Sequence, residues 1–335
     1  MMNTIKNVLV VGSGAIAKRH IRNIKTLFPE SSILLVFPTG RQALEGEFDH
    51  DVSVTAWSEI GHVAFDAAIV ASSSSTHLEY SFPLAEMGIP VLIEKPIAHD
   101  AKAFGVTFDK ISVLPPQVLV AYNMRFLSSA NKIKQMLSEG AVGRLAGVHA
   151  LVGQYLPDWR PQKDYRTSVS ARTELGGGVL LELSHEFDYL RWLFGDFTGG
   201  FCHARTSGLL ELKVEDTADV ILEHAGGWVA NVHLDMLRRE PSRHCTIVGE
   251  HGTLTWDILN NTIYRQMSGE HQKTLIYDGS GWDRNNMYID MLVSCFAVEG
   301  WQDDRRCTVD FAWQTLQLVD ILKESSRSRS WQELR

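Results

Sequence analysis

The first 122 residues alternate short apolar runs with longer segments that carry apolar residues at helical spacing. Runs of about five apolar, often β-branched residues are typical of strands buried in a parallel sheet. Six strands are expected, at residues 6–11, 32–37, 51–54, 67–71, 89–93 and 117–121. Helical patterns lie between several of them, at residues 18–27, 77–87 and 101–111. This alternation predicts a doubly wound parallel α/β sheet in an N-terminal dinucleotide-binding domain of residues 1–122.

After residue 122 the pattern changes to longer segments in which apolar and polar residues alternate. One helix is expected at residues 130–139, followed by strands at 143–154, 218–224 and 228–235 and by shorter strands up to residue 264. This pattern predicts a second α/β domain of residues 123–335, with an open, mostly antiparallel sheet. One face of that sheet is expected to carry substrate or a subunit contact. A closing helix at 311–323 belongs to this domain, with the option of packing back on the first.

Composition and charge narrow the class of protein. The chain has 335 residues, 44% of them hydrophobic, and a net charge of −8, so a nucleic-acid partner has no overall electrostatic support. No apolar stretch reaches the roughly 18 residues of a spanning helix, and the N-terminus has no signal-peptide core. The four cysteines are scattered without metal-ligand spacing. We expect a cytoplasmic protein with no membrane partner and no metal.

The first strand runs directly into Gly12-Ser13-Gly14-Ala15-Ile16-Ala17, a GxGxxA pattern that precedes a helix. Gly12 permits a tight turn, Gly14 lets the backbone approach a pyrophosphate, and Ala17 allows close packing of helix on strand. The helix N-terminus then faces the anion. The pattern predicts NAD(P) binding along residues 12–16, and the alternative is an ordinary turn between strand and helix.

The end of the second strand bears on the choice of cofactor. An NAD site usually has an acid there, but this chain reads Phe37-Pro38-Thr39-Gly40-Arg41. A guanidinium suits a 2′-phosphate, through paired hydrogen bonds or stacking on adenine. Thr39 and Arg41 therefore favour NADP over NAD, unless Arg41 is a solvated loop residue.

Polar residues also follow the fourth and fifth strands. Ser72 and Ser73 begin a serine-rich loop, and Glu94-Lys95-Pro96 ends the fifth strand. Ligands of open α/β sheets bind at the carboxyl ends of strands, so both segments are candidates for the cofactor crevice. The alternatives are a helix-capping loop for the serines and a surface ion pair for Glu94 and Lys95.

In the second half, Gly176-Gly177-Gly178 leads into an amphipathic helix that is expected to run without a break from Val179. On such a helix Glu182, His185 and Asp188 share a face, because residues three apart are neighbours. These three are candidates for an acid–base group. The alternative is a histidine bonded within its own helix.

The glycine turn, the Glu94-Lys95-Pro96 strand end and the His185 helix occur in an order and at separations that closely resemble the Gfo/Idh/MocA oxidoreductase family, which includes glucose-fructose oxidoreductase and inositol dehydrogenase. The resemblance implies a Rossmann domain and a C-terminal sheet domain that pairs as a homodimer or homotetramer. It implies that Lys95 lies beside the nicotinamide and the reacting hydroxyl, and that His185 is the acid or base.

The same resemblance extends to further residues. Ser72, Ser73 and His77 match the second cofactor loop, and Glu94 is placed on the cofactor side. Asn123 and Arg125 lie in a segment that looks like the NxRF motif at the nicotinamide end, so Asn123 is grouped with the cofactor and Arg125 with the substrate.

One departure from the family concerns the partner of His185. Many members have an aspartate four residues before the histidine, where this chain has Leu181. Glu182 could take that role if the segment before the helix is one residue shorter than in those members. Alternatively, Asp188 could orient His185. Both remain open.

The segment that precedes the glycines supplies the substrate candidates Trp159, Arg160, Tyr165 and Arg166. Aromatic rings stack on the apolar faces of sugars, and arginines suit a carboxylate, a phosphate or a nucleotide-linked sugar. The expected function is hydride transfer between NAD(P) and a secondary hydroxyl or ketone of a sugar, polyol, sugar acid or nucleotide sugar. The alternatives are a redox-assisted glycosidase or lyase with tightly bound NAD, and a non-catalytic NAD(P)-sensing protein.

Overall fold

The computed structural model describes residues 5–38, 40, 47–48, 52–108, 117–297 and 303–334. The chain forms two compact units, Met1–Asn123 with Asn285–Trp313, and Met124–Arg284 with Gln314–Arg335. The segment Asn285–Trp313, which the sequence pattern assigned to the second domain, thus groups with the first unit. The reason is that its helix α8 (Asn286–Leu292) packs on α1 (Ala15–Leu27) and its strand β15 (Cys307–Thr308) pairs with β6 (Val118–Val120).

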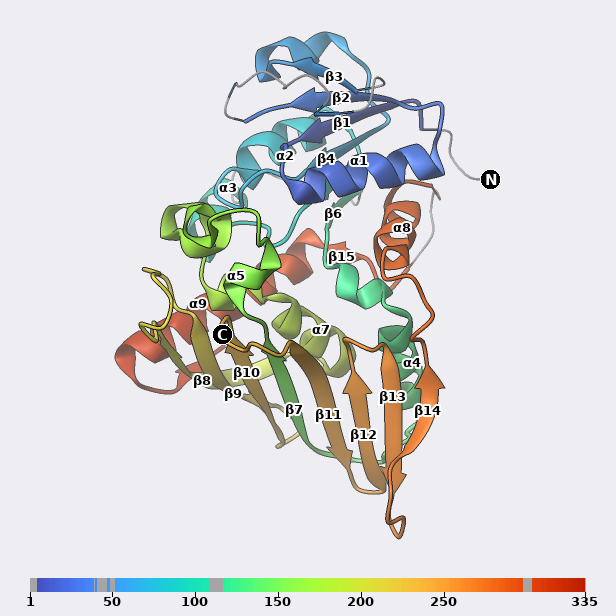
Figure 1. Ribbon diagram of the computed structural model, residues 1–335, viewed down its shortest axis with the longest axis vertical. Helices are drawn as coiled ribbons and strands as arrows, with labels where there is room; N and C mark the ends of the chain where they lie inside the picture. Colours follow the sequence, from blue (N-terminus) through green and yellow to red (C-terminus); the bar gives the residue numbers. More distant parts are fainter. Residues whose placement is uncertain are drawn as a thin grey trace. The chain divides into compact units, whose positions relative to one another are not determined.

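Within the described residues, the first unit is built on a sheet of seven strands in the order β15-β6-β5-β4-β1-β2-β3 (Figure 1). All neighbours are parallel except β15, which is antiparallel to β6. The remaining strands are β1 Asn7–Val11, β2 Ser32–Val36, β3 Val52–Thr55, β4 Ala67–Val70 and β5 Val91–Ile93, and the remaining helices are α2 His77–Glu86 and α3 Ala101–Phe108. The expected Rossmann-type parallel sheet is confirmed.

The central strands of this sheet are buried on both faces, which explains their continuous apolar sequence. Four consecutive residues of β1, Val8 to Val11, are inaccessible to solvent, and so are all residues of β5. Because every strand but β15 points the same way, the carboxyl ends of β1, β4 and β5 lie at one edge of the sheet. That edge carries the glycine turn, the serine loop and Glu94-Lys95-Pro96.

The second unit contains a sheet of nine strands in its described part, in the order β14-β13-β12-β11-β7-β10-β9-β8-β16. Only the pair β7 and β10 is parallel, so the expected mostly antiparallel sheet is confirmed. The strands are β7 Leu145–Gly153, β8 Phe197–Arg205, β9 Thr217–His224, β10 Val229–Asp235, β11 Ser242–Gly249, β12 Gly252–Asp257, β13 Thr262–Met267, β14 Thr274–Asp278 and β16 Gln332–Glu333.

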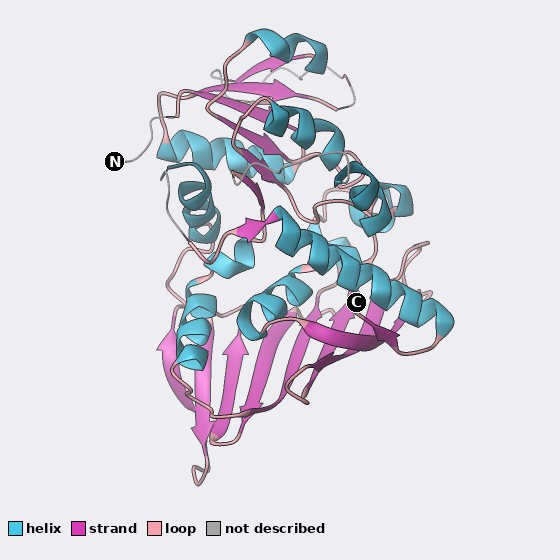
Figure 2. Cartoon of the chain, turned by 180° about the vertical axis from the view of Figure 1, so that it is seen from behind, coloured by secondary structure: helices cyan, strands magenta, loops and turns pink. Residues whose placement is uncertain are grey.

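The longer helices of this unit lie against one face of its sheet (Figure 2). These helices are α4 Ser128–Ser138, α7 His185–Phe194 and α9 Val309–Ser328, whose first five residues belong to the first unit. The unit also has two one-turn helices, α5 Leu156–Trp159 and α6 Val179–Glu182. The second unit also has short 3₁₀ helices at Tyr165–Thr167, Val169–Ala171 and Thr173–Leu175, and another, Asn123–Phe126, lies where the two units join in the sequence. In the first unit, a 3₁₀ helix occurs at Trp57–His62 and a π-helix at Val293–Ala297. Ala230, Val232 and Leu234 of β10 are buried under the helices, whereas Asn231 and His233 point to the open face.

The expected continuous helix from Val179 is wrong, because α6 ends at Glu182 and α7 begins at His185. The N–H of Leu183 still donates to the carbonyl four residues back, but the N–H groups of Ser184 and Glu186 donate to carbonyls three residues back. This tightening interrupts the α-helical ladder at residues 183–184. Glu182 and His185 therefore do not share the face of one helix.

Candidate active site

The glycine turn after β1 has the geometry of a phosphate cradle. Gly12 has φ +120°, and a Cβ atom on it would lie 2.3 Å from the carbonyl oxygen of Ala71, so only glycine fits. Gly14 caps α1, and a Cβ atom on it would meet nothing within 4 Å. Gly14 and Ala15 are exposed, Ser13 and Ile16 are half-exposed, and Ala17 is fully buried. The start of α1 thus offers open space and free backbone donors to an anion, and these residues fit a dinucleotide.

The serine loop after β4 is held by its own side chains and by His77. The hydroxyl of Thr76 donates to Ser72 Oγ at 3.0 Å, and Ser73 Oγ lies 3.2 Å from Ser75 Oγ. His77 is 1% exposed, with Nδ1 2.9 Å from the carbonyl oxygen of Pro96 and Nε2 3.2 Å from that of Ser72. Burial lowers the pKa of His77. Its buried ring therefore links the serine loop to the turn that follows Lys95.

Glu94-Lys95-Pro96 directly follows β5, where the Glu94 N–H donates to the carbonyl of Val70. The Glu94 carboxylate is nearly buried and lies 2.7 Å from Nε2 of His20, a fully buried residue of α1. Its second oxygen accepts the N–H of Lys95 at 3.2 Å. The Lys95 side chain is half-exposed, and the Lys95–Pro96 bond is cis.

The remaining cofactor candidates are Thr39, Arg41 and Asn123, and the structure describes only the last of them. Thr39 and Arg41 lie outside the described residues. Asn123 is buried, and its amide bonds the hydroxyl of Tyr288 on α8. Burial and the nearby carboxylate of Glu94 raise the pKa of Tyr288. The α8 segment therefore contributes to the environment of Glu94 in the first unit.

In the second unit, the three glycines position the start of α6. Gly178 has φ +109°, and a Cβ atom on Gly177 would lie 2.5 Å from the carbonyl oxygen of Val169. The close approach lets the 168–172 segment lie against α6, where Ser170 Oγ donates to Glu182 at 2.9 Å. His185 is half-exposed at the first position of α7.

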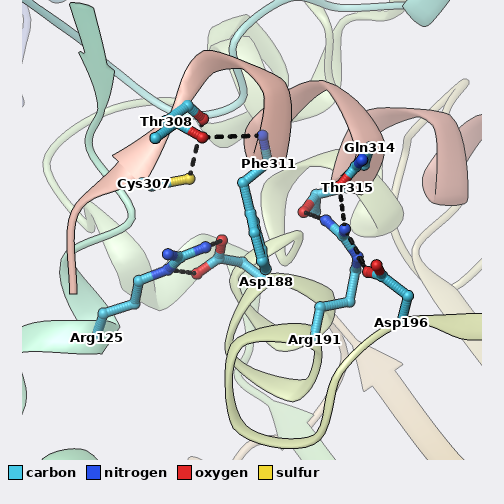
Figure 3. A network of polar contacts seen from close by, with 9 residues as sticks. All are labelled: Arg125, Asp188, Arg191, Asp196, Cys307, Thr308, Phe311, Gln314 and Thr315. Atoms are coloured by element: carbon cyan, nitrogen blue, oxygen red, sulfur yellow. Dashed lines mark hydrogen bonds and ion pairs between the residues drawn. The ribbon is translucent and has the colours of Figure 1, made fainter. Parts of the chain in front are cut away.

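Asp188 and Arg125 form a fully buried ion pair (Figure 3). Nε and Nη2 of Arg125 donate to the two carboxylate oxygens of Asp188 at 2.9 and 2.6 Å. The Arg125 side chain is 2% exposed, so its guanidinium offers no surface to a substrate. The pair instead anchors the helix that carries His185 to the segment after residue 123.

A second arginine anchors the other end of α7, and the sequence pattern did not identify it. Arg191 donates to Asp196 at 2.8 Å, to Thr315 at 2.7 Å and to Gln314 at 2.7 Å (Figure 3). No motif signals this cluster, because its members are separated by up to 124 residues.

Two hollows in the second unit include three of the substrate candidates, Trp159, Arg160 and Tyr165. One has a volume of about 240 Å³ and is lined by Trp159, Arg160 and Tyr165. The other, of about 150 Å³, is lined by Trp159 and Leu183 and also by Arg243. Arg166 lines neither hollow, because it is exposed and pairs with Asp164 and Glu211.

Arg243 and His20 are functional candidates that sequence reasoning missed. Arg243, on β11, pairs with the fully buried Glu186 of α7. Glu186, a charged residue next to His185, could have been noticed in the sequence, but its partner Arg243 lies 57 residues away. His20 follows the glycine pattern on the inner face of α1, where helical periodicity could have placed it.

Comparisons with known proteins agree for both halves of the chain. Residues 6–110 match the model of an oxidoreductase family with an NAD-binding Rossmann fold, and residues 130–255 match the model of the GFO/IDH/MocA C-terminal domain. The chain is 29% identical to inositol 2-dehydrogenase 2 of Saccharopolyspora erythraea, over 68% of this chain and 66% of that protein.

Two solved structures have a similar fold. A levoglucosan dehydrogenase in complex with NADH and L-sorbose aligns with a TM-score of 0.81 and 17% identity, over 98% of this chain and 99% of that one. The WlbA dehydrogenase from Bordetella pertussis, in complex with NADH and UDP-GlcNAcA, aligns with a TM-score of 0.76 and 21% identity, over 98% of each chain. In the described part of this chain, no helix is long and apolar enough to cross a membrane.

Proposed function

The chain belongs to the Gfo/Idh/MocA oxidoreductase family, and we propose that it transfers a hydride between NAD(P) and a secondary hydroxyl or ketone of a carbohydrate. The observation that carries the proposal is the placement of Glu94-Lys95-Pro96 in the first unit. This turn ends β5 at the sheet edge where the open glycine turn ends β1, with only β4 between the two strands. Lys95 is thus the cation at the edge where such sheets bind dinucleotides.

The cofactor would be held by the backbone around Gly12 and Gly14 and by the serine loop. When bound, NAD(P) supplies the hydride acceptor or donor. NADP is the preferred form in this proposal, because β2 ends at Val36 and residues 37–41 contain no acid, while Thr39 and Arg41 suit a 2′-phosphate.

Lys95 and His185 have complementary roles in this proposal. As an ammonium, Lys95 binds the reacting hydroxyl and stabilises the alkoxide that develops on it. His185 takes the hydroxyl proton when the alcohol becomes a ketone and returns it in the opposite direction, a task that suits imidazole because its ordinary pKa is about 6.5. Glu182 and Asp188 have supporting roles in this proposal, because they fix the segments on either side of His185. Glu182 bonds Ser170, and Asp188 bonds Arg125.

The substrate is proposed to be a sugar, polyol, sugar acid or nucleotide sugar. The relatives named above include an inositol dehydrogenase and a levoglucosan dehydrogenase. Trp159 and Tyr165 can stack on the apolar face of a sugar ring, and Arg160 can bind an acid group. We further propose that the protein forms homodimers or homotetramers through the open face of the nine-stranded sheet.

The test is a substrate screen by nicotinamide absorbance with the purified full chain. Inositols, anhydrosugars, sugar acids and nucleotide sugars are each offered with NAD⁺ and with NADP⁺. We expect turnover of at least one class, faster with NADP⁺. Lys95→Ala should lower kcat by about a hundredfold or more, because the alkoxide loses its cation. His185→Ala should lower it by about a hundredfold or more through loss of the acid–base group.

Lys102→Ala is the matched control, since Lys102 is an exposed lysine of α3 in the same unit. It should leave kcat unchanged. Near-normal turnover in Lys95→Ala would contradict the assignment. Release of a leaving group with no net change in nicotinamide absorbance would instead indicate a redox-assisted lyase or hydrolase.

A further inference from the structure

Two buried histidines contact the residues on either side of Lys95. His20, of α1, bonds the side chain of Glu94, and His77, of α2, bonds the main chain of Pro96. We infer that His20 and His77 are positioning residues, which aim Lys95 by fixing its two neighbours. This inference rests on the proposed role of Lys95 in hydride transfer.

The contact through His20 reaches the backbone of Lys95 itself. Nε2 of His20 lies 2.7 Å from one oxygen of Glu94, and the other oxygen accepts the N–H of Lys95 at 3.2 Å. The carboxylate is therefore fixed at both oxygens, between α1 and the residue to be aimed. The His20 ring also packs edge-on against Tyr288, with ring centroids 6.1 Å apart, which fixes the orientation of the imidazole.

The contact through His77 holds the other side of the turn. Nδ1 lies 2.9 Å from the Pro96 carbonyl and Nε2 lies 3.2 Å from the Ser72 carbonyl. Nδ1 makes the shorter of the two contacts, and a hydrogen bond weakens as its length grows. The stronger bond of His77 is thus directed at Pro96.

A turn that is fixed on both sides matters because lysine is long and flexible. Its four-carbon stem has many rotamers, so the direction of the ammonium depends on a backbone that does not shift. A misplacement of about 1 Å at a reacting group can cost about a hundredfold in rate. An apolar side chain at either position would take a donor away from the buried Glu94 carboxylate or from the Pro96 carbonyl, so a test must separate loss of stability from loss of aim.

Substitution of each histidine by asparagine and by glutamine separates the positioning role from a general effect on stability. The amide nitrogen of asparagine replaces Nδ1 of histidine, and that of glutamine replaces Nε2. His77→Asn keeps the donor to Pro96, whereas His77→Gln loses it. At position 20 the pattern is reversed, because His20→Gln keeps the donor to Glu94 and His20→Asn loses it.

The experiment measures kcat, the KM of the cofactor and the melting temperature for these four variants. We expect kcat to stay within about threefold of wild type in His77→Asn and His20→Gln, and to fall by about tenfold or more in His77→Gln and His20→Asn. Cofactor KM should change little in any of them. In a Lys95→Ala background, neither His77→Gln nor His20→Asn should lower the residual kcat further, because residues that act through one group are not additive.

Two results would overturn the inference. One is equal kcat for the asparagine and glutamine variants at both positions. The other is a full additional loss of kcat in the Lys95→Ala background. Failure of the proposed function looks different, because Lys95→Ala itself would then keep normal turnover. If one variant does not fold, the pair at the other position decides.

Discussion

At position 188, a carboxylate without solvent contact has both oxygens bound by one guanidinium. The side chains of Arg125 and Asp188 are 2% and 0% exposed, so neither charged group is hydrated. Such pairs contribute little net stability compared with apolar residues, but removal of one partner leaves an uncompensated buried charge. The pair is therefore a point where a single substitution has a large effect.

We predict that Asp188→Ala lowers the free energy of unfolding by about 3–5 kcal/mol, because Arg125 is left charged and buried. Urea unfolding followed by circular dichroism measures this difference. Glu174→Ala, which removes the carboxylate of the exposed Arg172–Glu174 pair, is the matched control and should change stability far less. The double variant Arg125→Met with Asp188→Leu should recover part of the loss. Equal effects of Asp188→Ala and Glu174→Ala would contradict the prediction.

Residue types could be identified from the sequence, whereas their partners could not. Lys95 and His185 stood out because a charge at a strand end and a histidine on a helix after three glycines are local patterns. The partners of Asp188 and Glu94 lie 63 and 74 residues away, so no local spacing encodes them. Arg125 was consequently grouped with the substrate, although the fold uses it to hold α7.

At the scale of elements, periodicity located strands better than it located helix ends. Strands β1, β4 and β5 lie within two residues of their expected bounds, because apolar runs between polar turns are a strong signal. The break between α6 and α7 gave no such signal, since Leu183 and Ser184 fit the helical pattern. It arises from a local change of hydrogen-bond register that apolar spacing does not report.

On the open face of the second sheet, His233 of β10 lies between two carboxylates. Nδ1 is 2.6 Å from Asp219 on β9, and Nε2 is 3.2 Å from Asp235. The hydrogen bond to Asp235, together with that to Asp219, raises the pKa of His233, although partial burial opposes the shift. Burial acts to raise the pKa of Asp235, but His233 and the backbone N–H groups of Leu237 and Arg238 lower it to about 2.

The folded state therefore favours protonated His233, and its contribution to stability depends on pH. A raised pKa gives stability that is complete below the unfolded value of about 6.5 and is lost as the pH rises through the folded value. We predict that His233→Gln is less stable than wild type by up to about 1 kcal/mol in acid solution, and that the difference shrinks as the pH rises. Urea unfolding at a fixed protein concentration measures it. His203→Gln, on β8 at the other side of β9, is the control and should show no such dependence on pH. A pH-independent difference for His233→Gln would contradict the prediction.

At the scale of the whole molecule, the two-part organisation was evident from the change of pattern after residue 122. The sequence pattern did not indicate that Asn285–Trp313 belongs to the first unit. The reason is that α8 packs on α1 and β15 pairs with β6, and both partners are far away in the sequence. Topology of this kind depends on which surfaces fit together, and the periodicity of a segment does not contain that information.

The open face of the nine-stranded sheet leads to the last prediction. It is hollowed by about 460 Å³ and carries Phe201 and Ile221 among polar residues, with Ile221 42% exposed. Nine strands spaced about 4.8 Å apart make a face wide enough for the about 800 Å² per partner of a typical stable interface. Ile221 lies on β9, an interior strand of this sheet, and an exposed apolar side chain there is expected to be covered in an oligomer.

We predict that the wild-type chain is a dimer or tetramer and that Ile221→Arg shifts it toward monomer, because two copies of a charge would meet across a two-fold axis without water. Light scattering coupled to size-exclusion chromatography measures the mass of each species. Leu209→Arg is the matched control, since Leu209 is 78% exposed but lies outside the strands of the sheet, and its mass should equal that of wild type. A monomeric wild type, or an unchanged mass in Ile221→Arg, would show that copies of the chain do not pair through this face.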